Sequence, residues 1–141
     1  WIGASSDAGI KRATELGDGF IFGTAGPQFM AEMTPKIRAS AEENNRKNYK
    51  VAGVAYFAVG DDAQAALEAG SKSLLRYYGG SLWAPPEQII HHGPIEVIEQ
   101  VVREYADAGL DLLYLMPVIP EVKQVDLIAE HVLPAYRIPG R

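Results

Sequence analysis

The chain alternates between short apolar runs and longer stretches in which apolar residues recur at helical spacing. The apolar runs are nearly continuous, with little polar alternation, which is typical of strands covered on both faces. They predict four buried strands, at residues 1–3, 19–22, 51–59 and 112–116. The amphipathic stretches predict helices at residues 7–16, 29–45, 61–78, 94–108 and 122–136, followed by a loose tail at residues 138–141.

Glycine and proline mark several boundaries of these elements. Gly17 and Gly109 each follow a predicted helix, at the C′ position where a left-handed glycine is common. An aspartate, Asp18 or Asp111, comes soon after each glycine, so the same helix-to-strand junction occurs twice. Pro35 suits the first turn of a helix, which allows the second helix to begin later than residue 29.

The order of the predicted elements indicates the fold class. Strands that alternate with helices predict parallel β-α units joined by right-handed crossovers. Four such units form either an open sheet or part of a β/α barrel, and their spacing alone does not choose between the two. An open doubly wound sheet would hold a ligand where the strand order reverses, whereas simple succession of the strands would exclude it. We therefore predict an α/β fold with about four parallel strands and flanking helices.

Composition narrows the range of partners. The 141 residues suffice for one domain with a real core, and 48% of them are hydrophobic and 22% charged. A formal net charge of -5, with scattered basic residues, argues against a nucleic-acid or anionic-membrane partner. No apolar run approaches the roughly 18 residues that span a bilayer. Cysteine is absent, which removes disulfides, thiol catalysis and cysteine-based zinc sites. We expect a cytoplasmic protein.

Three stretches of the chain share their order and spacing with one enzyme family. They are WIGASSDAGIKRATELGDGF near the start, YFAVGDDAQAALEAG in the middle, and GPIEVIEQVVREYADAGLDLLYLMPV followed by LIAEHVLPAYR near the end. Together, over residues 1–137, they resemble the luciferase-like monooxygenases. The resemblance implies a TIM-type β/α barrel and an enzyme that uses reduced flavin (FMN) or a reduced deazaflavin coenzyme.

The resemblance also implies which part of a barrel this chain represents. The family's barrel has eight β-α units, and the chain maps onto the last four, so residues 1–141 are expected to form the C-terminal half of a barrel domain. Half a barrel keeps two open sheet edges and exposes part of its inner wall. At ~25 cal/mol per Å² of apolar surface, exposure of several inner-wall side chains costs several kcal/mol of stability. We therefore expect it to pair with the missing N-terminal half or with a second copy, or to rearrange its terminal strands. Some of these side chains should face water: Val54, Tyr56, Phe57, Tyr114 and Met116.

The loop GASSDAG, after the first predicted strand, is the first candidate for coenzyme binding. Active sites of β/α barrels are built from such loops, and a helix N-terminus with small residues favours an anion. By resemblance, loops of this kind lie near the coenzyme's ribityl phosphate. This makes Gly3, Ala4, Ser5 and Ser6 candidate coenzyme contacts. Alternatively, Ser5 or Ser6 merely caps the helix, and the two roles are compatible. Ala4 replaces a second glycine found in many relatives, which disfavours a very close phosphate approach.

A second loop, GTAGPQF, follows the second predicted strand. Thr24, with the flexible Gly23 and Gly26, is a candidate to border the isoalloxazine ring or the substrate, although glycine and proline also simply turn the chain. In GDDAQAA, after the third strand, the two aspartates are expected to cap a helix rather than bind a metal, because neither a histidine nor a further carboxylate is nearby. No metal site is predicted.

For the remaining candidate residues, structural roles are predicted rather than catalytic ones. His91 and His92 point in different directions on a regular backbone, so they cannot share one metal without an unusual turn, and a surface or interface role is favoured. His131 is expected to face solvent. Pro117 and Pro120 stiffen the loop after the last strand. The chain contains no dinucleotide fingerprint, P-loop or nucleophile elbow.

Two hypotheses for function follow. The resemblance implies a flavin- or deazaflavin-dependent oxidoreductase that acts on a small molecule, by monooxygenation or by hydride transfer, with the coenzyme carrying the electron chemistry. No catalytic residue is assigned, because by resemblance the proton-transfer side chains lie in the N-terminal half, and the 141-residue chain alone is expected to be inactive. The alternative is a stand-alone half-barrel binding or assembly module, a dimer with no redox role. Flavin binding discriminates between them.

Overall fold

A computed structural model describes residues 1–136 of the chain. The chain divides into two compact units: Trp1–Ala55 with Arg103–Tyr114, and Tyr56–Val102 with Leu115–Arg141. Strand β2 (Lys50–Val59), helix α5 (Ile95–Asp107) and strand β4 (Leu112–Pro117) each contribute residues to both units. The tail predicted at residues 138–141 lies outside the described residues.

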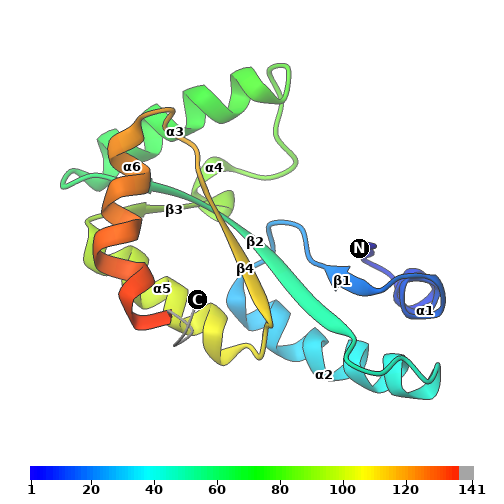
Figure 1. Ribbon diagram of the computed structural model, residues 1–141. Coiled ribbons are helices and arrows are strands. Elements are labelled where there is room, and N and C mark those ends of the chain that lie inside the picture. Colours follow the sequence, from blue (N-terminus) through cyan, green and yellow to red (C-terminus); the bar gives the residue numbers. More distant parts are fainter. Residues whose placement is uncertain (137–141) are drawn as a thin grey trace. The chain divides into compact units, whose positions relative to one another are not determined.

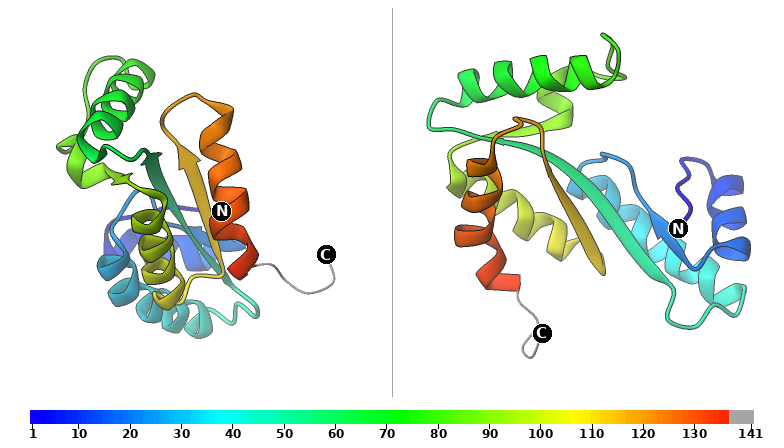
Figure 2. Two further views of the ribbon diagram at one scale, coloured as in Figure 1. Left: turned by 90° about the vertical axis from the view of Figure 1, so that its left-hand side faces the viewer. Right: turned by 45° about the horizontal axis from the view of Figure 1, so that its top comes forward.

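A parallel sheet of about four strands carries the fold (Figure 1). Strand β1 (Gly19–Ile21) pairs with the first part of β2, where Phe20 lies opposite Val51. Strand β3 (Ile90–Gly93) pairs with the last part of β2, where His91 lies opposite Phe57. Strand β4 also pairs with β2 and lies beside it in each view (Figures 1 and 2). The predicted α/β class, with about four parallel strands and flanking helices, is confirmed.

The first predicted strand is reduced to a single parallel bridge between Ile2 and Phe20. The Ile2 amide donates to the Gly19 carbonyl at 3.0 Å, and the Ile21 amide donates to the Ile2 carbonyl at 3.2 Å. Two elements were not predicted at all: the short helix α4 (Pro86–Ile89) and β3. Each has only four residues, and β3 contains two histidines, so neither gives a periodic apolar signal.

Helices α1 (Asp7–Leu16) and α2 (Pro27–Glu43) pack together in the first unit. The Thr14 hydroxyl lies 2.8 Å from the Ser40 hydroxyl, and the Asn44 amide donates to Thr14 Oγ1 at 3.0 Å. The buried core around them comes from the strands, α2 and α5, and its largest members include Phe20, Met30, Ile37, Val51 and Tyr105.

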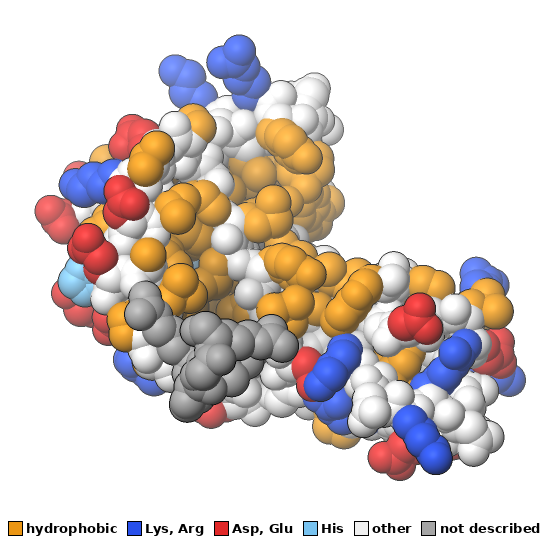
Figure 3. All heavy atoms as spheres, viewed as in Figure 1, with side chains coloured by type: hydrophobic (Ala, Val, Ile, Leu, Met, Phe, Trp, Pro, Cys, Tyr) orange, Lys and Arg blue, Asp and Glu red, His pale blue; other side chains and the backbone are white. Residues whose placement is uncertain are grey.

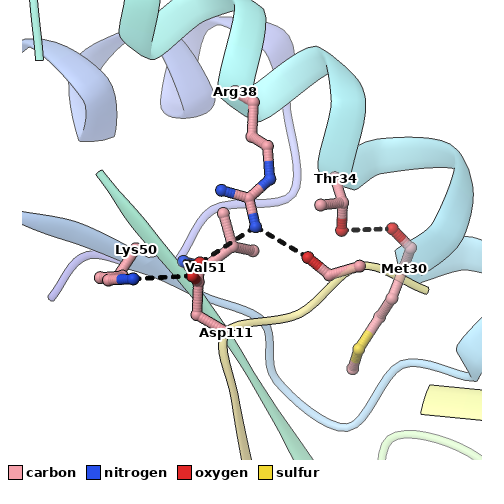
Figure 4. A network of polar contacts seen from close by, with 7 residues as sticks. Met30, Thr34, Arg38, Lys50, Val51 and Asp111 are labelled. Carbon is pink, nitrogen blue, oxygen red and sulfur yellow. Dashed lines mark hydrogen bonds and ion pairs between the residues drawn. The ribbon is translucent and has the colours of Figure 1, made fainter. Parts of the chain in front are cut away.

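Helix α2 begins at Pro27, two residues before the predicted start, and continues through Pro35, so the later start that Pro35 allowed is not found. A proline inside a helix lacks the amide that would bond the carbonyl four residues earlier. That carbonyl belongs to Ala31, an exposed residue, so water can satisfy it. The neighbouring Thr34 hydroxyl donates to the Met30 carbonyl at 2.7 Å (Figure 4).

The two glycine junctions are not equivalent. Gly109 has φ +78°, as predicted for a left-handed C′ residue. Gly17 has φ -91° and ψ 163°, which is extended backbone, so the left-handed prediction was wrong there. A Cβ on Gly17 would lie 2.8 Å from the Ala13 carbonyl oxygen, so close packing, not positive φ, explains this glycine.

Helix α3 (Ala63–Tyr77) packs on strand residues of the second unit. A Cβ on its Gly70 would lie 2.7 Å from Val118 and 3.3 Å from Ala58, so glycine permits this close approach. The last helix runs as α6 (Val122–Leu127), a π-helical turn (Ile128–Val132) and a 3₁₀ turn (Leu133–Tyr136). The buried Gln124 side chain accepts from the Val59 amide at 2.8 Å and donates to the Val59 carbonyl at 2.9 Å. It therefore continues the hydrogen-bonding pattern of the strand.

One face of β4 is exposed. Leu112, Tyr114 and Met116 alternate along the strand and keep 42%, 44% and 43% of their surface exposed. Hydrophobic side chains gather where β4 runs (Figure 3). The predicted exposure of inner-wall residues is therefore confirmed for Tyr114 and Met116. Tyr56 and Phe57, named with them, are buried, and Val54 is partly buried.

Candidate functional site

Two loops of the first unit leave the same edge of the sheet. The bridge between Ile2 and Phe20 is parallel, so residues 3–6 and residues 23–26 both follow the carboxyl ends of neighbouring strand segments. The structure therefore brings Gly3, Ala4, Ser5 and Ser6 to the same sheet edge as Thr24. In Figure 1 the first loop leads from the N-terminus into α1, and the second joins β1 to α2.

The first loop packs closely against β1 and starts α1. A Cβ on Gly3 would lie 2.8 Å from the Ile21 carbonyl oxygen, so a larger residue there would displace the loop. Ser6 is the N-cap of α1, and its hydroxyl accepts from the Gly9 amide at 3.2 Å. The capping interpretation is therefore confirmed for Ser6. Gly3, Ser5 and Ser6 are exposed and Ala4 is partly buried.

The first loop has both polar groups that suit an anion and a charge that opposes one. Ser5 and Ser6 are exposed residues, and the first-turn amides of α1 have no backbone acceptor within the helix, although the Gly9 amide already bonds the Ser6 hydroxyl. The Asp7 carboxylate, in the same first turn, opposes an anion. Because Asp7 is exposed, water screens this repulsion.

The second loop is held by a tyrosine that the sequence did not single out. The Tyr105 hydroxyl donates to the Ala25 carbonyl at 2.9 Å, and the Ala25 amide donates to the Gly23 carbonyl at 2.9 Å. Burial, with a smaller contribution from the Glu104 charge, raises the pKa of Tyr105 to about 12, so the hydroxyl remains a donor at neutral pH. Gly23 is exposed, apart from its chain neighbours no atom lies within 4 Å of where its Cβ would be, and Thr24 is partly buried.

A polar network lies at the opposite, amino edge of the strands (Figure 4). Asp111 accepts from the Val51 amide at 2.9 Å, from Arg38 at 3.0 Å and from Lys50 at 2.9 Å. Arg38 also donates to the Gly109 carbonyl at 2.8 Å. Burial alone would raise the pKa of Asp111, but the hydrogen bonds from Val51, Lys50 and Arg38, with the Arg38 charge, lower it. The sequence marked Asp111 only as part of a repeated junction.

A hollow of about 550 Å³ lies beside this network and contains Arg38, Arg46 and Lys47. Arg46 donates to the carbonyls of Thr14 and Glu15 in the last turn of α1. Arg38 is held by Asp111 and Gly109. The two arginines thus have structural partners, and we assign the hollow no ligand.

Asp62 caps α3, as predicted for the GDDAQAA segment. Its carboxylate accepts from the amides of Gln64 and Ala65 at 2.9 and 3.0 Å. Within residues 1–136, no three side chains of metal-binding type come together. No helix among these residues is long and apolar enough to cross a membrane.

The histidines lie on two different elements. His91 and His92 are partly buried in β3, and His92 Nδ1 lies 2.9 Å from the Ile90 carbonyl oxygen. Their surface or interface role stays a prediction. His131 is exposed, as expected.

Comparison with known proteins identifies the family. A family model described as luciferase-like monooxygenase matches residues 1–111. A search of curated proteins found no match. The fold is similar to an F420-dependent secondary alcohol dehydrogenase in complex with an F420-acetone adduct (19% identity, TM-score 0.76, 96% of this chain and 48% of that chain). It is also similar to a coenzyme F420 dependent tetrahydromethanopterin reductase from Methanopyrus kandleri (19% identity, TM-score 0.74, 96% and 50%).

A third similar structure is a long-chain alkane monooxygenase (16% identity, TM-score 0.62, 94% of this chain and 39% of that chain). The chain thus spans about half the length of these proteins, or less. At such identities the likeness shows the fold alone, and it agrees with the predicted partial β/α fold. The family match covers residues 1–111 of 141. The chain therefore belongs to the luciferase-like monooxygenase family.

Proposed function

We propose that the chain is part of a flavin- or deazaflavin-dependent oxidoreductase that acts on a small organic substrate. The observation that carries this proposal is the pair of loops at one carboxyl edge of the sheet, in a chain of the luciferase-like family. Similar folds include F420-dependent enzymes and a monooxygenase, which supports either hydride transfer or monooxygenation. The coenzyme, FMN or a deazaflavin in its reduced form, supplies the electron chemistry.

The two loops have separate roles in this proposal. Gly3, Ala4, Ser5 and Ser6 hold the coenzyme phosphate through backbone amides and hydroxyls at the start of α1. Thr24 borders the ring system on the open side of the second loop, which Tyr105 keeps in place through the Ala25 carbonyl. No residue of the chain is assigned to proton transfer.

The proposal includes a partner for the chain. We infer that residues 1–141 form the C-terminal half of a β/α-barrel domain, completed by an N-terminal half or by a second copy. The exposed apolar face of β4 supports this, because closure of a barrel would cover it. The chain alone is then inactive. Its cysteine-free composition fits a cytoplasmic enzyme.

A titration with FMN and with riboflavin tests the phosphate site. Riboflavin has the same ring system without the phosphate, so the 141-residue chain should bind FMN more tightly. Ser5→Ala should weaken FMN binding about tenfold or more, as expected for a hydrogen bond to a charged group, and leave riboflavin binding unchanged. The exposed Ser81 provides a matched Ser81→Ala control.

The contrary results are equally specific. If neither FMN nor a deazaflavin coenzyme binds and the chain is a stable dimer, the stand-alone module is the better account. If FMN and riboflavin bind equally, the phosphate does not contact residues 3–6. Turnover of reduced coenzyme by the isolated chain would contradict its proposed inactivity.

A further inference from the structure

A small cavity in the second unit has the composition of a substrate pocket. It measures about 170 Å³ and is lined by β2, by the end of α3 and by the end of β4 and the residues after it. This is below the roughly 300–1,000 Å³ of a pocket for a drug-sized ligand, so it suits a small molecule or one group of a larger one. Its lining includes Tyr56, Ser73, Tyr77, Met116 and Pro117.

Tyr56 lines this largely apolar cavity, and its hydroxyl is paired with that of Tyr78, a residue outside the lining. Tyr56 is buried, and its hydroxyl lies 2.6 Å from the hydroxyl of Tyr78. Burial first, and then the hydrogen bond with Tyr78, raises the pKa of Tyr56, so the Tyr56 hydroxyl stays protonated at neutral pH. One of the two hydroxyls donates its hydrogen to the oxygen of the other. The second hydroxyl then keeps an O–H that can donate to a ligand oxygen.

An exposed row of aromatic rings adjoins the cavity. Tyr78 packs edge-on against Tyr77 at 5.0 Å and against Trp83 at 5.1 Å between ring centroids. Tyr77 is 78% exposed and Trp83 is 55% exposed. Hydrophobic side chains gather near the end of α3 in Figure 3. Aromatic groups left in water beside an apolar cavity mark a place where a ligand gains by covering them.

The turn after α3 positions these rings. Gly79 and Gly80 have φ +73° and +98°, and the Gly80 amide donates to the Leu75 carbonyl at 2.7 Å. No atom lies within 4 Å of where a Cβ on either glycine would be, so backbone conformation, not packing, requires glycine here. This turn ends α3 and returns the chain so that Trp83 reaches Tyr78.

We propose that this cavity binds a small and largely apolar molecule that carries one hydroxyl or carbonyl oxygen. The apolar part of this ligand contacts Tyr77 and Met116, and its oxygen bonds the Tyr56 hydroxyl. This proposal does not depend on the proposed function.

Two probes that differ by one hydroxyl test the proposal by NMR titration of the 141-residue chain. They are p-cresol and toluene. The chain should bind p-cresol about three- to tenfold more tightly than toluene, the range for one hydrogen bond between neutral groups. Tyr56→Phe should remove this difference, and Tyr77→Ala should weaken both probes about three- to tenfold by loss of ring contact. The exposed Tyr136 gives the control Tyr136→Phe, which should change neither affinity.

The outcomes separate this proposal from the proposed function. No binding of either probe, or equal probe binding by the wild type, Tyr56→Phe and Tyr77→Ala, overturns the pocket even if FMN binds. The expected probe pattern without any coenzyme binding keeps the pocket and overturns the oxidoreductase.

Discussion

Asp111→Ala removes the acceptor that joins the start of β2 to the turn before β4 in the first unit. In the folded chain this carboxylate accepts from the Val51 amide, Arg38 and Lys50, and its side chain is 22% exposed. The Val51 bond, a part-buried amide to a charged acceptor, contributes about 1.5–3 kcal/mol. The Arg38 and Lys50 side chains are 39% and 56% exposed, so screening limits each ion pair to about 0–1 kcal/mol.

The free energy of unfolding should therefore fall by about 2–4 kcal/mol in Asp111→Ala at pH 7. Urea unfolding followed by circular dichroism measures it. Lys50→Ala, which removes only the more exposed ion pair, should cost no more than about 1 kcal/mol and serves as the matched control.

The effect of Asp111 should also depend on pH. The pKa of the folded carboxyl is lowered, so its stabilisation is fully present above the ordinary aspartate pKa of about 3.9 and is lost as the pH falls through the folded value. The difference between wild type and Asp111→Ala should shrink in acid. A cost below about 1 kcal/mol at pH 7, or a difference that does not change in acid, would refute this account.

Three further variants test other contacts. Gln124→Leu leaves the Val59 amide and carbonyl without their partner and should cost about 2–4 kcal/mol in urea unfolding, whereas Gln64→Leu on the surface should cost little; equal costs would contradict the strand-capping role. Gly70→Val forces a side chain into Val118 and should cost about 1–3 kcal/mol; a wild-type midpoint would argue against this packing. Tyr105→Phe should cost about 1 kcal/mol and weaken FMN binding, and unchanged binding would show that its bond to the second loop is irrelevant to the coenzyme.

The alternation of strands and helices was predictable because both periodicities are long and strong. The bounds of α1 match the prediction, and the other long elements agree within a few residues. Short elements such as β3 were missed because their pairing with β2 decides them, not their own four residues. Pro35 suggested a helix start, yet it lies inside α2. Tertiary packing stabilises the helix despite the one hydrogen bond that proline removes.

The position of the candidate site could be predicted from the sequence, but the contacts that hold its surroundings in place could not. Fold topology alone places residues 3–6 and Thr24 at one edge, since both follow parallel strands. Tyr105 bonds Ala25 across 80 residues of sequence, and Asp111 bonds Val51 across 60. No local sequence pattern predicts contacts between residues so far apart. Likewise, Gly17 and Gly109 look identical in sequence, yet one avoids a clash and the other adopts positive φ.

The most direct test of the account is a map of backbone amide shifts as FMN, and separately a deazaflavin coenzyme, is added to the isotope-labelled chain. We predict the largest shifts at residues 3–6 and at Thr24, with little change around Asp111. The absence of shifts, or shifts confined to the amino edge near Arg38 and Lys50, would contradict the proposal that this chain carries a coenzyme-binding edge.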